Sequence, residues 1–228
     1  MTRVKAVSID LDDTLWPIRP VIEKAERALH EWLMQNCPRI ALNGHGHLGT
    51  IHRRVVQRYP ERTHDFAFMR KTGISMMLEE AGYEKALAER AYQEFFAARN
   101  EVEIFDDVVP SLQRLARRFP LLAVTNGNAD LERIGLASHF AHLVRASEVG
   151  VAKPEAEIFH AAARAAGVRP EEVLHVGDAP VEDVSGARSA GMQVVWMNRF
   201  ARSWPDEHPR PMAEISVLDE LEALLADN

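Results

Sequence analysis

Residues 4–14 of this 228-residue chain read VKAVSIDLDDT. The first six of these residues form a short β-favouring run, and three acids, Asp10, Asp12 and Asp13, follow it within four positions. An apolar run that ends abruptly in polar residues is typical of a buried parallel strand. We therefore predict a strand over residues 4–9 that delivers carboxylates to the loop at its end.

Similar runs recur in the second half of the chain, separated by segments with helical spacing. Strands are predicted at 121–124, 142–145, 173–176 and 193–197, and helices at 107–117, 130–136, 155–166, 181–190 and 217–225. The proline-rich stretch 204–211 is predicted to be a loop. Strands that alternate with helices indicate an α/β fold in which helices cover both faces of a parallel sheet.

The segment between the first two predicted strands has a different pattern. Apolar residues recur at helical spacing over 21–35, 64–80 and 83–99, and the glycine-rich stretch 43–49 is predicted to be a loop. An all-helical insertion in an α/β chain is expected to form a separate domain. The predicted domains are a core of residues 1–16 and 100–228 and a helical cap of residues 17–99.

The composition narrows the class of protein. The chain is 46% hydrophobic and 27% charged, which is typical of a soluble globular protein. Its formal net charge is −7, whereas a nucleic-acid-binding protein usually carries a basic stripe, so we expect no nucleic-acid partner. The single cysteine, Cys37, excludes an intrachain disulfide, and no apolar stretch is long enough for a signal peptide or a membrane span. We expect a cytoplasmic enzyme without a membrane partner; its oligomeric state stays open.

Polar side chains cluster where three of the predicted strands end. Because functional groups of doubly wound folds gather at the carboxyl ends of the strands, these side chains are expected to meet at one edge of the sheet. A lysine before a proline, at a loop-to-helix junction, adds a positive charge. Together they supply carboxylates, a hydroxyl, an amide and an ammonium, a set suited to phosphoryl transfer: Asp10, Asp12, Thr125, Asn126, Lys153, Asp178 and Asp183.

Asp10 and Asp12 lie two positions apart, so on an extended chain their carboxylates project to the same side. Two such carboxylates repel each other unless a cation or a shared proton lies between them, and Mg²⁺ prefers oxygen ligands of this kind. One carboxylate is then available as a nucleophile and the other as a general acid and base. Taken singly, each cluster is explained as well by turn residues, helix caps or an exposed lysine. Four such coincidences in one order are improbable.

The order of these motifs resembles the haloacid dehalogenase-like hydrolases. The matching elements are D-x-D-x-T at 10–14, a strand-end threonine, a lysine, and G-D-x-x-x-x-D at 177–183. The resemblance implies a Rossmann-like core with a C1 cap, a magnesium cofactor and an aspartyl-phosphate intermediate. It also implies these roles: Asp10 is the nucleophile and Asp12 the general acid/base; Asp10, the Asp12 backbone carbonyl and Asp178 bind Mg²⁺, supported by Asp183; Thr125, Asn126 and Lys153 hold the phosphate.

Finer similarity, in residues 10–20, 125–129 and 174–178, is to the bacterial FMN and pyrimidine phosphatases of the riboflavin pathway. It implies a small phosphomonoester substrate such as FMN or 5-amino-6-(5-phospho-D-ribitylamino)uracil. Trp16, Arg19 and Arg70 are further candidates for substrate contacts, although packing and solvated helix faces also explain them.

Other members of the family keep rival functions open. Sugar-phosphate and nucleotide phosphatases and phosphomutases share these motifs, and a non-catalytic binding protein could keep the fold. Dehalogenases of this family lack an acid at the position of Asp12, because a departing halide needs no proton, so its presence favours phosphate-ester cleavage.

Overall fold

The computed structural model describes residues 2–43 and 47–226. The chain divides into two compact units. The core unit consists of Met1–Pro17, Glu103–Gly127 and Leu131–Asn228, and the helical unit of Ile18–Val102 and Asn128–Asp130. The three residues Asn128–Asp130 belong to the helical unit, whereas the sequence assigned them to the core. Two hydrogen bonds join this stretch to the helical unit: the Asn128 amide donates to Tyr92 Oη at 3.1 Å, and the Asp130 N–H donates to Asn100 Oδ1 at 2.7 Å.

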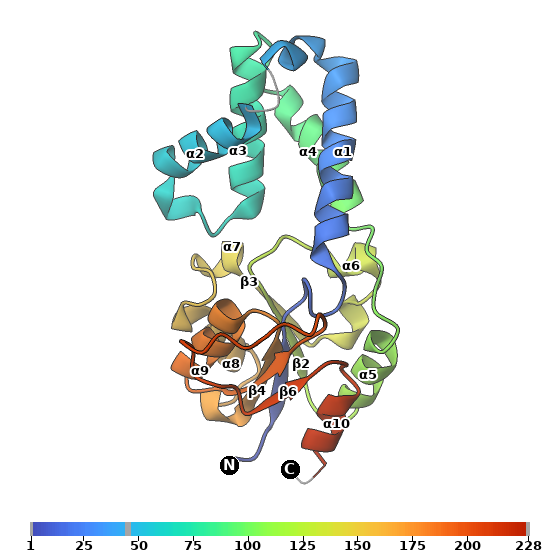
Figure 1. Ribbon diagram of the computed structural model, residues 1–228, viewed down its shortest axis with the longest axis vertical. Helices are drawn as coiled ribbons and strands as arrows, with labels where there is room; N and C mark the ends of the chain where they lie inside the picture. The colour runs from blue at the N-terminus through green and yellow to red at the C-terminus, as the bar shows by residue number, and fades with distance from the viewer. Residues whose placement is uncertain (1, 44–46, 227–228) are drawn as a thin grey trace. The chain divides into compact units, whose positions relative to one another are not determined.

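A six-stranded, wholly parallel sheet forms the centre of the core unit, which confirms the predicted α/β fold. Its strand order is β3-β2-β1-β4-β5-β6 (Figure 1). The bounds are β1 (Ala6–Ile9), β2 (Leu121–Thr125), β3 (His142–Arg145), β4 (Val173–Gly177), β5 (Gln193–Met197) and β6 (Ala213–Ile215). Every residue of β1, β2 and β4 is buried. The edge strand β6 was not predicted.

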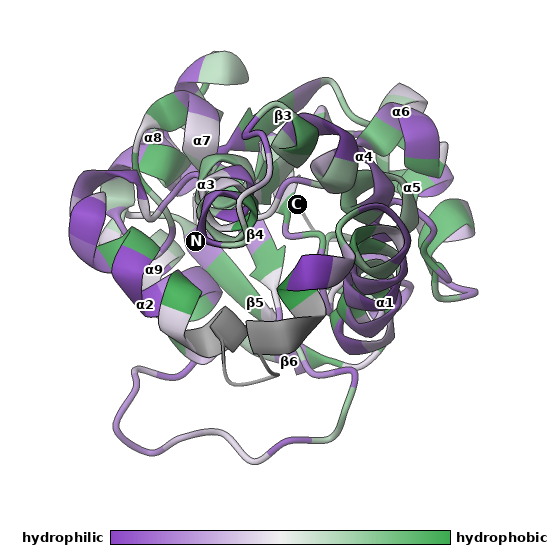
Figure 2. Cartoon of the chain, turned by 90° about the horizontal axis from the view of Figure 1, so that it is seen from above, coloured by the Kyte–Doolittle hydropathy of each residue, from purple (hydrophilic) through white to green (hydrophobic). Residues whose placement is uncertain are grey.

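Helices cover both faces of this sheet, with α8 and α9 on one face and α5 on the other (Figures 1 and 2). Figure 2 shows the hydrophobic colouring of the strands around β4 and β5 between these layers. The α-helices of the core unit are α5 (Val108–Leu115), α6 (Leu131–Ile134), α7 (Ala146–Val149), α8 (Ala156–Ala165), α9 (Gly186–Ser189) and α10 (Glu220–Leu224). Short 3₁₀ turns, η3 (Ala137–His139) and η4 (Pro170–Glu172), precede β3 and β4. The single helix predicted over 181–190 is a π-helical turn, η5 (Pro180–Ser185), followed by α9.

The helical unit has its own apolar core. Its helices are α1 (Ile18–Asn36), α2 (His47–Arg58), α3 (Phe66–Glu80) and α4 (Leu87–Arg99), with 3₁₀ turns η1 (Pro38–Asn43) and η2 (Pro60–Arg62). α4 packs against α1 and α3, and α2 packs against α3. In α1 the buried residues recur every four positions, at Val21, Ala25, Leu29 and Leu33, so one apolar stripe faces the core of this unit.

The glycine-rich stretch 43–49 is not a loop throughout, because α2 begins at His47. Residues 44–46 of that predicted loop lie outside the described residues. Within the described part of the chain, no helix is both long enough and apolar enough to cross a membrane.

Candidate active site

The candidate site lies at the point where the strand order of the sheet reverses. β1 pairs with β2 on one side and with β4 on the other, so chain connections leave in opposite directions from this point. Ligands of doubly wound folds bind in the crevice that results, beyond the carboxyl ends of the strands. Asp10 follows β1 directly, its N–H donates to Val176 O of β4 at 2.9 Å, and Asp178 follows β4.

Three carboxylates converge at this point, those of Asp10, Asp178 and Asp183. Each offers one oxygen, and these three atoms lie within 4.8 Å of one another. The ammonium of Lys153 pairs with Oδ1 of Asp10 and lies 2.6 Å from Oδ1 of Asp183. Asp10, Asp183 and Lys153 are almost fully buried, with 6%, 1% and 5% of their surfaces exposed. The Lys153 ammonium, together with the half-exposed Arg202 guanidinium 3.4 Å from Asp178, leaves one of the three negative charges unbalanced, so the cluster has the charge and the oxygen donors of a divalent cation site.

The surroundings shift the pKa values of the cluster in opposite directions. Burial raises the pKa of Asp10 well above its usual range; Lys153 opposes this shift, and Asp183 and Asp178 add to it. Burial, with Asp183 and Asp13 nearby, raises the pKa of Asp178 to about 7. For Lys153, burial would lower the pKa, but the Asp10 and Asp183 carboxylates outweigh it and raise the pKa. The lysine therefore stays charged, and the excess negative charge rests on the acids.

The Asp183 carboxylate forms hydrogen bonds with three groups of the core unit. Its Oδ1 contacts Lys153 Nζ at 2.6 Å and His175 Nε2 at 3.2 Å, and its Oδ2 accepts the Ala179 N–H at 3.0 Å. Burial opposes ionisation, but the Lys153 charge and the His175 hydrogen bond hold the pKa of Asp183 below its ordinary value. Gly177 makes room for this carboxyl, because a Cβ at that position would lie 2.3 Å from Asp183 Cγ. Asp183 therefore orients Lys153.

His175 was not predicted as part of the site, although it lies in β4 next to the residues that were. It is fully buried, with Nδ1 2.8 Å from Ser8 Oγ and Nε2 3.2 Å from Asp183 Oδ1. Burial lowers the pKa of His175, so a neutral imidazole links Ser8 of β1 to Asp183. The only available signal was a polar residue within an otherwise apolar buried strand.

The turn after β1 positions Asp12. Asp13 has φ 59°, a left-handed conformation that aspartate tolerates, and its N–H donates to Trp16 O at 2.8 Å. The Trp16 indole Nε1 donates to Asp12 Oδ1 at 2.9 Å. Trp16 itself is completely buried, and its indole N–H contacts Asp12. Stacking of Trp16 on a substrate ring stays a prediction.

Asn126 contacts the backbone of Lys153 with both ends of its amide. The amide donates to Lys153 O at 3.0 Å, and its Oδ1 accepts the Lys153 N–H at 2.7 Å. These two bonds fix the loop that carries the lysine. Thr125, at the end of β2, is buried, and its Oγ1 accepts the Gly127 N–H at 2.9 Å. Direct phosphate contacts by Thr125 and Asn126 stay predictions.

The two predicted arginine contacts lie in the helical unit. Arg19 pairs with Glu23 one turn along α1 at 3.0 Å, and its side chain is 89% exposed. Arg70 pairs with Glu26 at 2.5 Å, and its guanidinium lies 4.3 Å from the centroid of the Phe95 ring. Both side chains are thus engaged within their own unit, and a substrate contact for either stays a prediction.

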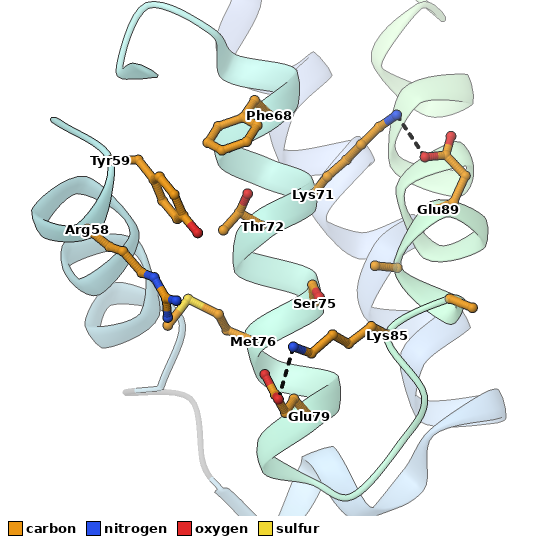
Figure 3. Close-up of a pocket in the computed structure, with 12 residues that line it drawn as sticks. Arg58, Tyr59, Phe68, Lys71, Thr72, Ser75, Met76, Glu79, Lys85 and Glu89 are labelled. Atoms are coloured by element: carbon orange, nitrogen blue, oxygen red, sulfur yellow. Dashed lines mark ion pairs between the residues drawn. The ribbon is translucent and has the colours of Figure 1, made fainter. Parts of the chain in front are cut away.

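A pocket of about 480 Å³ opens between helices of the helical unit (Figure 3). Its lining includes Tyr59, Phe68 and Thr72, while Lys71 and Lys85 pair with Glu89 and Glu79 at its rim. Both lysines are already paired with glutamates. Among the described residues that line this pocket, no lysine lies between two buried carboxylates as Lys153 does in the acidic cluster. We therefore do not take this pocket as the candidate catalytic centre.

A family model and two curated relatives match most of the chain. The haloacid dehalogenase-like hydrolase family matches residues 4–191. The chain is 33% identical over 231 residues to the 5-amino-6-(5-phospho-D-ribitylamino)uracil phosphatase YigB of Escherichia coli, covering 98% of this chain and 97% of that protein. It is 31% identical over 218 residues to a glyceraldehyde 3-phosphate phosphatase of Methanopyrus kandleri, covering 91% and 88% of the two chains.

One of the similar solved structures is named as a dehalogenase and not as a phosphatase. The crystal structure of a 2-haloacid dehalogenase from Pseudomonas syringae pv. Tomato DC3000 superposes with a TM-score of 0.94 at 38% identity, covering 98% of this chain and 99% of that one. The HAD-hydrolase YfnB of Bacillus subtilis, solved bound to magnesium, has a TM-score of 0.68 at 27% identity, with coverage of 98% and 99%.

Proposed function

The chain belongs to the haloacid dehalogenase-like hydrolases, and we propose that it is a magnesium-dependent phosphatase of small phosphomonoesters. The observation that carries this proposal is the arrangement around Asp10: a buried nucleophilic carboxylate paired with Lys153, with Asp12 two residues further on. Cleavage of a phosphate ester needs a nucleophile, positive charge for the phosphoryl oxygens and a proton for the departing alkoxide. Asp10, Lys153 and Asp12 supply these groups.

Asp12 favours this reaction over carbon–halogen cleavage. A halide leaves as a stable anion, whereas an alkoxide is a poor leaving group without a proton. The hydrogen bond from Trp16 Nε1 to Oδ1 of Asp12 orients the carboxyl that we propose for proton transfer. Dehalogenation is the second candidate function, because the structurally similar Pseudomonas syringae protein bears that name.

The residues of the acidic cluster fit a magnesium ion. Their donors are all carboxylate oxygens within 4.8 Å of one another, and the two cationic side chains at the cluster, Lys153 and Arg202, leave negative charge to be balanced. In the proposed site Asp10, Asp178 and the Asp12 backbone carbonyl would hold the ion, and Asp183 would support it by fixing Lys153. Bound Mg²⁺ would supply charge neutralisation for the phosphate. The related YfnB was solved bound to magnesium, which supports the choice of ion.

The proposed chemistry proceeds in two steps on Asp10. In the first, an Asp10 oxygen bonds to phosphorus as the phosphorus–oxygen bond to the leaving group breaks, and Asp12 gives its proton to the alkoxide. In the second, Asp12 takes a proton from a water molecule, the water oxygen bonds to phosphorus, and the bond to Asp10 breaks. Phosphate is released and both aspartates return to their starting states.

For the substrate we propose a riboflavin-pathway phosphate, either FMN or 5-amino-6-(5-phospho-D-ribitylamino)uracil. The name of the Escherichia coli relative, which matches over nearly the whole chain, supports this choice. Phosphatases of other small metabolites are also among the relatives, including phosphoserine phosphatase of Thermus thermophilus, so sugar phosphates, nucleotides and phosphoserine belong in the same screen.

The test is a phosphate-release screen over these compounds, with Mg²⁺ and with EDTA, run beside a halide-release assay on 2-chloropropionate. We expect phosphate release that requires Mg²⁺, no halide release, and loss of activity in Asp10→Asn with the fold intact by circular dichroism. Halide release without phosphate release would make the protein a dehalogenase. Transfer of the phosphoryl group to a second sugar would make it a mutase, and inactivity on every compound would favour a binding protein.

A further inference from the structure

Arg202 reaches the acidic cluster from the segment that follows β5. Its Nη1 lies 3.4 Å from Oδ2 of Asp178, and its Nη2 lies 3.9 Å from Oδ2 of Asp13. Arg202 was not predicted as a site residue. Its side chain is 50% exposed, while that of Asp178 is only 12% exposed. A positive charge on the solvent side therefore contacts a carboxylate that is largely buried.

The backbone of this segment is fixed beside Asp178. The side chain of Asn198 accepts the Arg202 N–H at 2.8 Å and donates to Arg202 O at 2.9 Å. Trp196 donates its indole N–H to Asp178 O at 2.7 Å, and its ring packs edge-on against Trp204 with centroids 4.9 Å apart. The backbone of Arg202 is thus held close to Asp178, while its side chain is half-exposed and places the guanidinium carbon 5.0 Å from the centroid of the Phe200 ring.

Arg202 differs from Lys153 in the carboxylates it contacts. Lys153 is buried and pairs with Asp10 and Asp183, whereas Arg202 is half-exposed and pairs with Asp178 and Asp13. A divalent cation bound to Asp178 would share that carboxylate with a guanidinium, and two positive charges on one carboxylate repel each other. A cation that binds there must either push the guanidinium aside or tolerate its charge.

We propose that Arg202 weakens divalent-cation binding at the acidic cluster by competing for the Asp178 carboxylate. The inference rests on the metal site of the proposed function. Arg202 then sets the metal concentration at which the enzyme is loaded, and a cation entering the site releases the guanidinium toward solvent.

The test measures Mn²⁺ binding to the full chain by electron paramagnetic resonance, without substrate. Mn²⁺ is the probe because, like Mg²⁺, it prefers carboxylate oxygens. Four proteins are compared with the wild type. Arg202→Met removes the charge and keeps the length of the side chain, Arg202→Lys keeps the charge, and Asp178→Asn removes the carboxylate. Arg210→Met is the matched control, because Arg210 lies further along the same segment and pairs at 3.7 Å with Asp206, which is 95% exposed.

We expect Arg202→Met to bind Mn²⁺ about tenfold more tightly than the wild type at low salt, with a smaller difference at high salt, since salt screens exposed charges. Arg202→Lys and Arg210→Met should stay near the wild-type affinity. The inference is overturned, with the metal site left intact, if Arg202→Met binds Mn²⁺ no more tightly than the wild type. The same holds if Arg202→Lys binds Mn²⁺ as tightly as Arg202→Met does. Absence of Mn²⁺ binding in both the wild type and Arg202→Met overturns the metal site as well, and unaltered binding by Asp178→Asn does the same.

Discussion

The indole Nε1 of Trp16 donates a 2.9 Å hydrogen bond to Oδ1 of Asp12. The two residues also form an isolated parallel bridge through their backbones. Trp16 is completely buried, so the indole is a rigid anchor for the carboxylate that we propose as general acid and base. Proton transfer by a positioned side chain contributes roughly 10²- to 10⁴-fold to a rate, and it depends on that position.

Replacing Trp16 with Phe should therefore lower kcat by about tenfold with little change in KM, because an aromatic ring stays in place but the hydrogen-bond donor to Asp12 is lost. Steady-state kinetics on the best phosphate ester measures this. In a double-mutant cycle, Asp12→Asn combined with Trp16→Phe should be no slower than Asp12→Asn alone, since the donor acts through that carboxylate. An additive loss in the double variant would show that Trp16 acts independently of Asp12.

Replacing Lys153 with Met should reduce kcat/KM by at least about 100-fold, because the ammonium would no longer oppose the charge of Asp10 and the phosphate. Stability should fall too, by about 3–5 kcal/mol, since two buried carboxylates lose their partner. Urea unfolding measures the second effect. Adding Asp183→Asn should restore part of the stability without restoring activity.

The matched control for Lys153 is Lys5, which pairs with Glu172 at 2.7 Å but has a side chain that is 56% exposed. Lys5→Met should cost less than about 1 kcal/mol, as exposed ion pairs usually do. Similar losses for both lysines would argue that the burial of the Lys153 pair has no special weight.

The sequence could predict the sheet and the acids because those signals are local. β1 and β4 are short apolar runs that end directly at Asp10 and Asp178, and parallel pairing then brings the two ends together. By contrast, β6 is only three residues long and follows a proline-rich stretch. Its place at the sheet edge comes from pairing with β5, a contact that no local pattern encodes.

Partners distant in sequence explain the remaining gaps. Asn126 reaches the backbone of Lys153 across 27 residues, so its observed role is to position the lysine. Asp107 is the first residue of the helix predicted over 107–117, yet its carboxylate accepts from Arg199 at 2.7 Å and from the Leu218 N–H at 2.6 Å. His175 and Arg202 were missed for the same reason, since their partners are fixed only when the sheet assembles.

Asp178 should contribute a loss of stability to the metal-free protein as pH rises from about 4 to about 7. Its pKa is raised from 3.8 to about 7 by burial and by the nearby Asp183 and Asp13 carboxylates. Between these values the folded protein holds a proton that the unfolded chain has released. Unfolding then releases a proton, so the free energy of unfolding falls with increasing pH across this window.

Asp178→Asn removes this dependence. In EDTA, its stability advantage over the wild type should grow from none below pH 4 to at most about 4 kcal/mol above pH 7, at 1.36 kcal/mol per pKa unit. Urea unfolding across this pH range measures it, with the exposed Asp206→Asn as a control that should leave the slope unchanged. A difference that does not vary with pH would contradict the shifted pKa.

Gly177 is the position where a single added carbon should disrupt the site. A Cβ there would lie 2.3 Å from Cγ and 2.5 Å from Oδ2 of Asp183, closer than real Cβ contacts allow. In Gly177→Ala, Asp183 has to turn away and lose its contacts with Lys153, His175 and the Ala179 N–H. We expect a loss of about 2–3 kcal/mol in stability from overpacking, together with weaker Mn²⁺ binding and lower kcat.

Gly73, in the middle of α3, provides the matched control for this substitution. An added Cβ there meets Ile51 Cγ2 at 3.4 Å, an ordinary contact, and alanine gains about 1 kcal/mol of helix propensity over glycine. Gly73→Ala should therefore be neutral or stabilising by urea unfolding, with unchanged kcat. Because the clash at Gly177 is with Asp183, the double variant Gly177→Ala/Asp183→Ala should be more stable than the sum of the single losses predicts. Strictly additive losses would mean that Gly177 is required for a reason other than making room for Asp183.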